Sequence, residues 1–331
     1  SEIDLNRIDY IIVNHGECDH SGSLASLMKR IPHTPIYCTA AAVKSLEGQY
    51  GKSGWNFNVV KTGDTLDIGN GKKLRFIEMK MLHWPDSMAV YMTGDNILFS
   101  NDAFGQHYAV EELFDNLADS AVLDGEALKY YANIIAPYAN VLRKKLDELK
   151  KMQLDIDIIA PSHGAVWRQN PMSIIEKYEQ WANDYKENQI VVAYDTMYEG
   201  TAKIARKIVE EINEQSPETV VKLYNISKSD KNDVMTEIFK SKSLIVGSPT
   251  ISNSIISGVA GWLEYLKQLK LKNKRGAAFG TYGWSGESVN IIQDKLREAG
   301  FDVIDENVKS LWNPTDEDFN QAKVLVSSIL A

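Results

Sequence analysis

His15-Gly16-Glu17-Cys18-Asp19-His20 places imidazole or carboxylate side chains at four of six consecutive positions. The stretch directly follows the apolar run 8–14, which predicts a buried strand. We therefore expect its polar side chains on a tight loop at the end of that strand. Imidazole and carboxylate ligands together suit a divalent transition metal, and their density suggests more than one ion. The stretch predicts a metal site.

Three later residues extend this prediction, namely His83, Asp102 and His163, each in a turn-like context beside a predicted strand. Taken alone, a buried histidine is most often a hydrogen-bonded core residue, and an aspartate after a strand is most often a turn residue. The neighbouring metal-capable stretch 15–20 favours metal binding over a purely structural role for these later residues. A carboxylate can bridge two cations with its two oxygens, which an imidazole cannot do. Asp102 is therefore the predicted centre of a dinuclear site, whereas His33 and His107 stay structural or unassigned.

Composition and charge exclude several classes of protein. The chain has 331 residues, of which 44% are hydrophobic and 24% charged, enough for two domains with separate cores. Its net charge of -9 argues against nucleic-acid binding, which needs a basic surface. The two cysteines, Cys18 and Cys38, show no spacing typical of a zinc knuckle, a rubredoxin-type iron site or a disulfide framework. With no signal peptide and no apolar stretch of membrane-spanning length, we expect a soluble cytoplasmic protein.

The predicted order of strands and helices differs between the two halves of the chain. Residues 1 to about 167 alternate short strands with few helices, and Gly-, Asn- and Asp-rich turns indicate a largely antiparallel or mixed sheet. The longest predicted helix covers 124–152, and a connecting helix covers 171–188. Beyond it, strands alternate with amphipathic helices, which predicts a doubly wound parallel sheet. The predicted strands are 190–194, 219–223, 243–247, 276–280 and 302–304. We expect two domains, 1–185 and 186–331.

Three loops of the second half predict a cofactor site. The loop from Thr196 to Thr201 offers hydroxyls and backbone N–H groups at a helix start, which suit a phosphate dianion, although a threonine-capped helix without ligand explains it too. The loops 248–253 and 281–286 follow later strands at the same carboxyl edge, where ligands of open α/β folds bind. An aromatic pair with flanking glycines in the last loop can cover a flat ring. No G-x-G-x-x-G follows the first strand, so a nicotinamide site is not expected.

The metal-ligand pattern resembles the metallo-β-lactamase-like αββα domain of flavodiiron proteins. Dinuclear zinc hydrolases of that fold usually have His-x-His-x-Asp-His, and Glu17 at the third position adds a hard oxygen that favours iron. Residues 100–107 also look like the family's sequence around its bridging aspartate. The resemblance implies one iron held by His15, Glu17 and His83, a second held by Asp19, His20 and His163, and a bridge from Asp102. Direct binding by the His20 equivalent varies in the family, so that ligand stays open.

The second half resembles flavodoxins, whose FMN phosphate loop usually reads Ser/Thr-x-Thr-Gly-x-Thr. Tyr198 and Glu199 depart from this pattern, and Gly200 comes one place later than its glycine. The resemblance implies FMN as cofactor. The residues implied to contact FMN are Thr196, Met197, Tyr198, Gly200, Thr201, Pro249, Thr250, Asn253, Tyr282, Gly283, Trp284, Ser285 and Gly286.

Both halves together resemble flavodiiron proteins over essentially the whole chain. The resemblance implies an oxidoreductase that reduces dioxygen to water, nitric oxide to nitrous oxide, or both, with no catalytic side chain apart from the metal ligands. It also implies a head-to-tail homodimer or dimer of dimers. Since the chain contains no Cys-x-x-Cys, the expected electron donor is a separate rubredoxin or a similar protein. Family members have further strands before the first ligand loop, so the αββα domain is expected to lack its N-terminal strands here.

Two other functions stay open at this point. One is a di-zinc hydrolase that uses a metal-bound hydroxide, fused to a flavodoxin-like domain. The other is a plain electron-carrier flavoprotein whose first domain has lost its metals. Glu17 and the flavodoxin-like half argue against the hydrolase, and the intact set of ligands argues against the electron carrier.

Overall fold

Two β-sheets form the framework of the first of two compact units in this computed structural model, which describes residues 3–52 and 54–331. The first unit ends at Ala182, and the second runs Asn183–Ala331. A parallel three-stranded sheet has the order β1-β2-β3, and a mixed five-stranded sheet has the order β4-β5-β6-β7-β8, in which only β8 is parallel to its neighbour. The strands are β1 (Ile11–Ile12), β2 (Ile36–Cys38), β3 (Phe57–Val59), β4 (Thr65–Gly69), β5 (Lys72–Glu78), β6 (Met88–Met92), β7 (Ile97–Asn101) and β8 (Ile158–Pro161).

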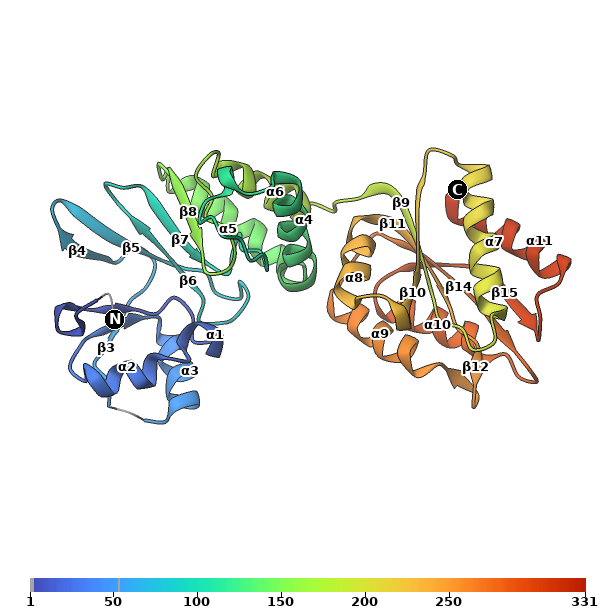
Figure 1. The fold of residues 1–331 in the computed structure, drawn as a ribbon, viewed down its shortest axis with the longest axis horizontal. Coiled ribbons are helices and arrows are strands. Elements are labelled where there is room, and N and C mark those ends of the chain that lie inside the picture. Colours follow the sequence, from blue (N-terminus) through green and yellow to red (C-terminus); the bar gives the residue numbers. More distant parts are fainter. Residues whose placement is uncertain (1–2, 53) are drawn as a thin grey trace. The chain divides into compact units, whose positions relative to one another are not determined.

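The described residues of this unit form six α-helices in addition to these sheets. The helices lie outside the two sheets, some on the side of the small sheet and the others on the side of the larger one, which gives the unit its layered α/β/β/α arrangement (Figure 1). Apolar side chains of both sheets share one core cluster, in which Tyr37 and Phe76 stack with ring centroids 6.2 Å apart. The helices are α1 (Cys18–Ser21), α2 (Leu24–Arg30), α3 (Ala40–Tyr50), α4 (Ser120–Tyr130), α5 (Ala139–Lys151) and α6 (Met172–Ala182).

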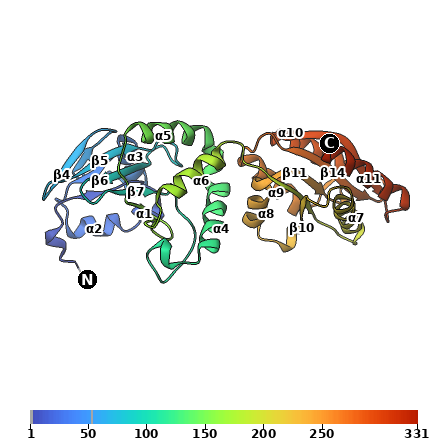
Figure 2. The ribbon, with the colours of Figure 1, turned by 90° about the horizontal axis from the view of Figure 1, so that it is seen from above.

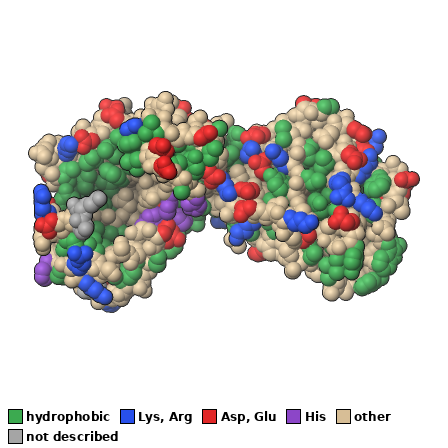
Figure 3. Space-filling view, in the orientation of Figure 1, with side chains coloured by type: hydrophobic (Ala, Val, Ile, Leu, Met, Phe, Trp, Pro, Cys, Tyr) green, Lys and Arg blue, Asp and Glu red, His purple; other side chains and the backbone are tan. Residues whose placement is uncertain are grey.

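An open apolar hollow of about 640 Å³ lies between the two sheets, and hydrophobic side chains line it (Figure 3). Ile12 of β1, Leu24 of α2 and Val90 of β6 are among the lining residues. The hollow extends to His15 and His20, so the loop after β1 is bordered by apolar surface on this side.

The second unit contains one parallel sheet of the order β10-β9-β11-β14-β15, with helices on both faces (Figure 2). In sequence order this is 2-1-3-4-5, the flavodoxin-like form of a doubly wound sheet, in which ligands bind at the carboxyl edge where the strand order reverses. A short hairpin, β12 (Thr250–Ile251) and β13 (Ser254–Ile255), follows β11. The other elements are β9 (Glu187–Tyr194), α7 (Gly200–Gln215), β10 (Val220–Asn225), α8 (Lys231–Lys240), β11 (Ser241–Gly247), α9 (Ser257–Gln268), β14 (Arg275–Tyr282), α10 (Glu287–Glu298), β15 (Asp302–Leu311) and α11 (Asp316–Leu330).

Both predicted sheet types are present, but some predicted elements differ in extent. The run 8–14 forms a strand only at Ile11–Ile12, and both side chains are half-buried rather than buried. The predicted helix 124–152 is broken between α4 and α5 by a π-type turn and a 3₁₀ turn that contains Pro137. Proline removes a backbone N–H and its ring clashes with the preceding turn, which accounts for the break. None of the helices formed by the described residues combines the length and the apolar character needed to cross a lipid bilayer.

Packing inside the parallel sheet makes a testable prediction at Gly247, the last residue of β11. A Cβ atom there would lie 2.2 Å from the Phe279 ring, so Gly247→Ala forces the ring or the strand to move. Overpacking of this kind costs about 1–3 kcal/mol. We expect the free energy of unfolding to fall by that amount in urea titrations followed by far-UV circular dichroism.

Gly261→Ala is the matched control for this substitution. Gly261 is exposed on α9, and a Cβ there would meet no atom within 4 Å. Alanine in a helix interior is favoured over glycine by roughly 0.5–1 kcal/mol, so this variant should be as stable as the parent or more stable. Equal urea midpoints for both variants would contradict the packing described here.

Candidate metal centre and cofactor cavity

The side chains predicted as metal ligands come from loops of both sheets in the first unit. The loop after β1 and the short helix α1 supply the first group, and their position is set by the pairing of β1 with β2. The larger sheet supplies the others from the β5–β6 loop and from the ends of β7 and β8, which run parallel. The structure brings together His15, Glu17, Asp19, His20, His83, Asp102 and His163.

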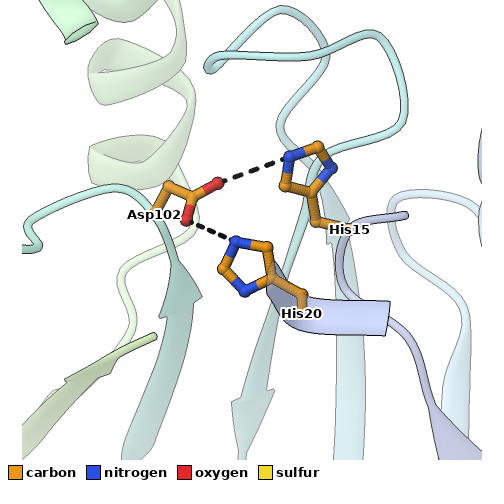
Figure 4. A group of neighbouring side chains, drawn as sticks. All are labelled: His15, His20 and Asp102. Carbon is orange, nitrogen blue, oxygen red and sulfur yellow. Dashed lines mark ion pairs between the residues drawn. The ribbon is translucent and has the colours of Figure 1, made fainter. Parts of the chain in front are cut away.

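Asp102 lies at the centre of this cluster and is buried (Figure 4). Its Oδ2 atom is 3.6 Å from Nε2 of both His15 and His83. Its Oδ1 atom is 3.0 Å from Nε2 of His20 and 3.3 Å from Nε2 of His163. Each carboxylate oxygen thus faces a different pair of imidazoles, which is the geometry required of a ligand that bridges two cations.

The remaining donor atoms divide into two groups of three. In each group the ligand atoms lie within 4.8 Å of one another, close enough to bind one ion. Glu17 Oε2 is 3.1 Å from His15 Nε2 and 3.5 Å from His83 Nε2, whereas Asp19 Oδ2 is 3.4 Å from His20 Nε2 and 3.3 Å from His163 Nε2. The first group is His15, Glu17 and His83, and the second is Asp19, His20 and His163.

The hydrogen bonding of the cluster suits the binding of a cation. Asp102 Oδ1 and His20 Nε2 are buried and 3.0 Å apart, yet neither has a hydrogen-bond partner of good geometry in the described structure. A buried polar atom without a partner costs about 1–3 kcal/mol. Imidazole and carboxylate donors that meet without such hydrogen bonds are well suited to a transition metal, and iron accepts this mixture of nitrogen and hard oxygen.

Burial and neighbouring charges shift the pKa values of three side chains in the cluster. Burial opposes charge on Asp102, but its interactions with His163 and His20 lower its pKa well below the usual range. The same pairing with Asp102 raises the pKa of His163, whereas burial lowers the pKa of His83. The Asp102 carboxylate is therefore ionised at neutral pH and available as an anionic ligand.

Sequence analysis missed the residues that surround the ligands. Asp86 is fully buried, and its Oδ1 atom accepts a hydrogen bond of 2.9 Å from His15 Nδ1. Asn101 Nδ2 donates to Asp102 Oδ2 at 3.0 Å. Tyr130 is buried beside His163, with ring centroids 6.2 Å apart, and the ring of His107, which was left unassigned, packs on Tyr130 at 4.8 Å. For Asp86, Asn101 and His107 the only signal in the sequence was their proximity along the chain to predicted ligands, and Tyr130 lacked even that signal.

A cavity of about 470 Å³ opens at the carboxyl edge of the sheet in the second unit. It lies where the loops after β9, β11 and β14 come together, which is where the sequence predicts a cofactor. Three exposed aromatic rings, of Tyr198, Trp284 and Trp312, contribute to its wall. The predicted residues that line it are Met197, Tyr198, Gly200, Pro249, Thr250, Tyr282, Gly283 and Trp284.

The other predicted contacts of the cofactor differ in their position. Thr196 Oγ1 is a buried atom without a partner in the described structure, whereas Thr201 Oγ1 is 2.9 Å from Thr281 Oγ1. Asn253 Nδ2 donates to Ser285 Oγ at 3.2 Å and to Glu287 Oε1 at 3.0 Å. Thr196 is thus the hydroxyl that is ready for a ligand, whereas the other side chains of this group bond within the protein. Gly286 ends the last loop directly before α10, and Tyr282 packs 3.2 Å from where its Cβ would stand.

Two features of this cavity were not predicted. Trp312 and Asn313, which follow β15 at the same sheet edge, belong to its lining. A Cβ on Gly283 would lie 2.8 Å from the Trp312 ring, so glycine allows this close packing. Glu199, where flavodoxins usually have glycine, adopts a left-handed backbone conformation with φ of 63°. The loop thus keeps the turn that glycine usually provides.

Comparisons with known proteins agree with this architecture. Residues 1–164 match the model of the ODP family beta lactamases, and residues 192–323 match that of flavodoxins. The solved structure of rubredoxin oxygen:oxidoreductase from Desulfovibrio gigas superimposes with a TM-score of 0.95 at 36% identity, over 99% of this chain and 81% of that one. The chain belongs to the flavodiiron protein family. Its predicted αββα and flavodoxin-like fold is thereby confirmed.

Other flavodiiron relatives differ in length and in the activity that their names state. The flavodiiron protein from Giardia intestinalis superimposes with a TM-score of 0.93 at 31% identity, over 98% of this chain and 80% of that one. The anaerobic nitric oxide reductase flavorubredoxin of Citrobacter koseri is 50% identical over 314 residues, which are 95% of this chain. The chain spans 65% of the length of that relative.

The central position of Asp102 makes a prediction for metal binding. Asp102→Ala removes the oxygens that face both groups of three ligands, so we expect this variant to bind fewer than one ion per chain. Asp19→Asn changes only the second group and should leave about one ion per chain. Metal content measured by plasma mass spectrometry after reconstitution tests both, with the cofactor content of the second unit as a folding control. Two ions per chain in Asp102→Ala would refute the bridge.

Proposed function

We propose that this flavodiiron protein reduces nitric oxide to nitrous oxide, and dioxygen to water, at a di-iron site fed by FMN. The observation that carries the proposal is the Asp102 carboxylate, whose two oxygens face two separate groups of ligands. The 50% identical relative is named as a nitric oxide reductase, and the 36% identical structure as an oxygen oxidoreductase. We place nitric oxide first for that reason.

The ligand assignment in this proposal follows the geometry of the cluster. His15, Glu17 and His83 would hold one iron, and Asp19, His20 and His163 the other. His20 is included because its Nε2 atom is buried without a hydrogen-bond partner in the described structure. Among these donors, the carboxylate of Glu17, where dinuclear zinc hydrolases of this fold usually have histidine, adds hard oxygen character that favours iron over zinc.

The cavity at the sheet edge of the second unit supports FMN. Its exposed tyrosine and tryptophan rings offer flat apolar surfaces to an isoalloxazine ring, and the Thr196 hydroxyl offers a hydrogen bond to the phosphate. Five predicted contacts do not line the cavity, namely Thr196, Thr201, Asn253, Ser285 and Gly286, and the last four would act through the shape of the loops.

Electron supply follows from the cofactors and the stoichiometry of the reactions. When bound, two ferrous ions would supply one electron each and reduced FMN would supply two. Two nitric oxide molecules need two electrons and two protons to form nitrous oxide and water, and dioxygen needs four of each to form two waters. Near the second ligand group, burial raises the pKa of Tyr130, so its phenol stays protonated and can donate a hydrogen bond.

The assembly and the donor are further parts of the proposal. We propose a head-to-tail homodimer, or a dimer of dimers, in which the FMN of one copy serves the iron of the other. Tyr198 and Trp284 are each 83% exposed at the cavity, which leaves apolar surface for a second protein. A rubredoxin or a similar small iron protein is the proposed external electron donor. The name of the Desulfovibrio gigas relative, rubredoxin oxygen:oxidoreductase, agrees with this proposal.

Anaerobic stopped-flow mixing tests the proposed reaction. The iron- and FMN-loaded protein is photoreduced and mixed separately with nitric oxide and with dioxygen, and flavin reoxidation is followed by absorption. We expect reoxidation by nitric oxide to be faster than that of free reduced FMN, with nitrous oxide as product. Zinc in place of iron, with no reoxidation beyond that of free flavin, would favour the di-zinc hydrolase instead.

Thr196 provides a separate test of the FMN site. Thr196→Val keeps the volume but removes the buried hydroxyl, and hydrogen bonds to charged groups contribute about 1.5–3 kcal/mol. We expect the Kd of FMN, measured by flavin fluorescence quenching, to rise by roughly ten- to a hundredfold. Riboflavin, which lacks the phosphate, is the control ligand, and its Kd should stay unchanged. An equal loss for both ligands would show that Thr196 does not contact the phosphate.

A further inference from the structure

Asp86 is a fully buried carboxylate in the loop before β6, and its side chain hydrogen-bonds to the first metal ligand and to the residue after it. Its Oδ1 atom accepts a hydrogen bond from His15 Nδ1 at 2.9 Å, and its Oδ2 atom accepts one from the backbone N–H of Gly16 at 3.0 Å. Ser45 of α3 also hydrogen-bonds to the carboxylate. No part of the proposed reaction uses this residue.

We propose that Asp86 is a positioning residue that fixes the tautomer and the ring orientation of His15 for metal binding. The inference rests on the proposed dinuclear site. A neutral imidazole carries its proton on one nitrogen and presents a lone pair on the other. In a neutral His15 whose Nδ1 proton is donated to Asp86, the lone pair is on Nε2, which lies 3.1 Å from Glu17 Oε2 and 3.6 Å from Asp102 Oδ2. The nitrogen that faces the other ligands is therefore the one able to bind a cation.

The packing around Asp86 shows that its position is fixed from several sides. A Cβ atom on Gly16 would lie 2.8 Å from Asp86 Oδ2 and 2.9 Å from Ser45 Cβ, so only glycine fits between them. The backbone carbonyl of Asp86 accepts a hydrogen bond of 3.1 Å from the Thr39 hydroxyl, which also caps α3. Gly16 therefore has a structural reason, because any larger residue at this position would collide with the Asp86 carboxylate.

The charge of Asp86 also acts on His15. An anionic acceptor on Nδ1 makes Nε2 a stronger electron donor, and loss of such a partner commonly weakens metal binding by about 10- to 100-fold. The second ligand group has no contact with Asp86 among the interactions described above, so its ion should be affected little.

Cobalt(II) titration of the metal-free 331-residue chain, followed by visible absorption, tests the inference. In Asp86→Asn the side-chain amide keeps the volume but loses the charge and places a donor near Gly16 N–H. We expect one of the two binding steps to weaken by about 10- to 100-fold while the other stays within about twofold. Ser45→Ala, which leaves Asp86 in place, should weaken the same step by less and serves as the milder variant.

Asp318→Asn is the matched control, because Asp318 is a buried carboxylate in the capping box of α11 in the second unit. It should leave both cobalt steps unchanged. Two unchanged steps in Asp86→Asn would overturn the inference, and so would equal weakening of both steps with a lower Tm, which indicates a general role in folding. If the parent chain itself bound no pair of ions, the proposed function would fail first, so the two failures can be told apart.

Discussion

Three carboxylates and four imidazoles converge in the first unit, and the repulsion between those carboxylates is the constraint on which the rest of that unit depends. Like charges this close are unfavourable unless cations lie between them. The structure meets this constraint by pairing each oxygen of Asp102 with imidazoles of a different ligand group. Loops from separate strands must end at one place for that pairing, and the parallel alignment of β7 and β8 brings Asp102 and His163 together.

In the second unit, the direction of the strands determines where the cofactor cavity forms. All five strands of its sheet are parallel, so their carboxyl ends share one edge. Loops that are distant in sequence, such as those that carry Met197, Thr250 and Trp284, meet there around one cavity. The strand order reverses beside β9, which leaves room for a flat ligand between neighbouring loops.

Sequence patterns predicted the parts of this molecule that depend on local or periodic signals. Ligand spacing, strand ends and strand-helix alternation identified the cluster around Asp102 and the loops of the second unit. The patterns failed where tertiary packing decides, as at Asp86, whose partner His15 is 71 residues away. Trp312 was missed because the last strand was predicted to end at residue 304, whereas β15 continues to Leu311 and carries the chain to the cavity. The break at Pro137 could have been predicted, since proline interrupts a helix interior.

The ligands of the first unit come from both of its sheets, with His15, Glu17, Asp19 and His20 on the small one and His83, Asp102 and His163 on the large one. Metal occupancy would therefore act as a crosslink between two layers whose interface contains an open hollow. An ion that binds only the folded state adds RT ln(1 + [L]/Kd) to stability, about 2.7 kcal/mol at a hundredfold excess over Kd. In a cell, iron supply would thus set how much of this chain stays folded as well as how much of it is active.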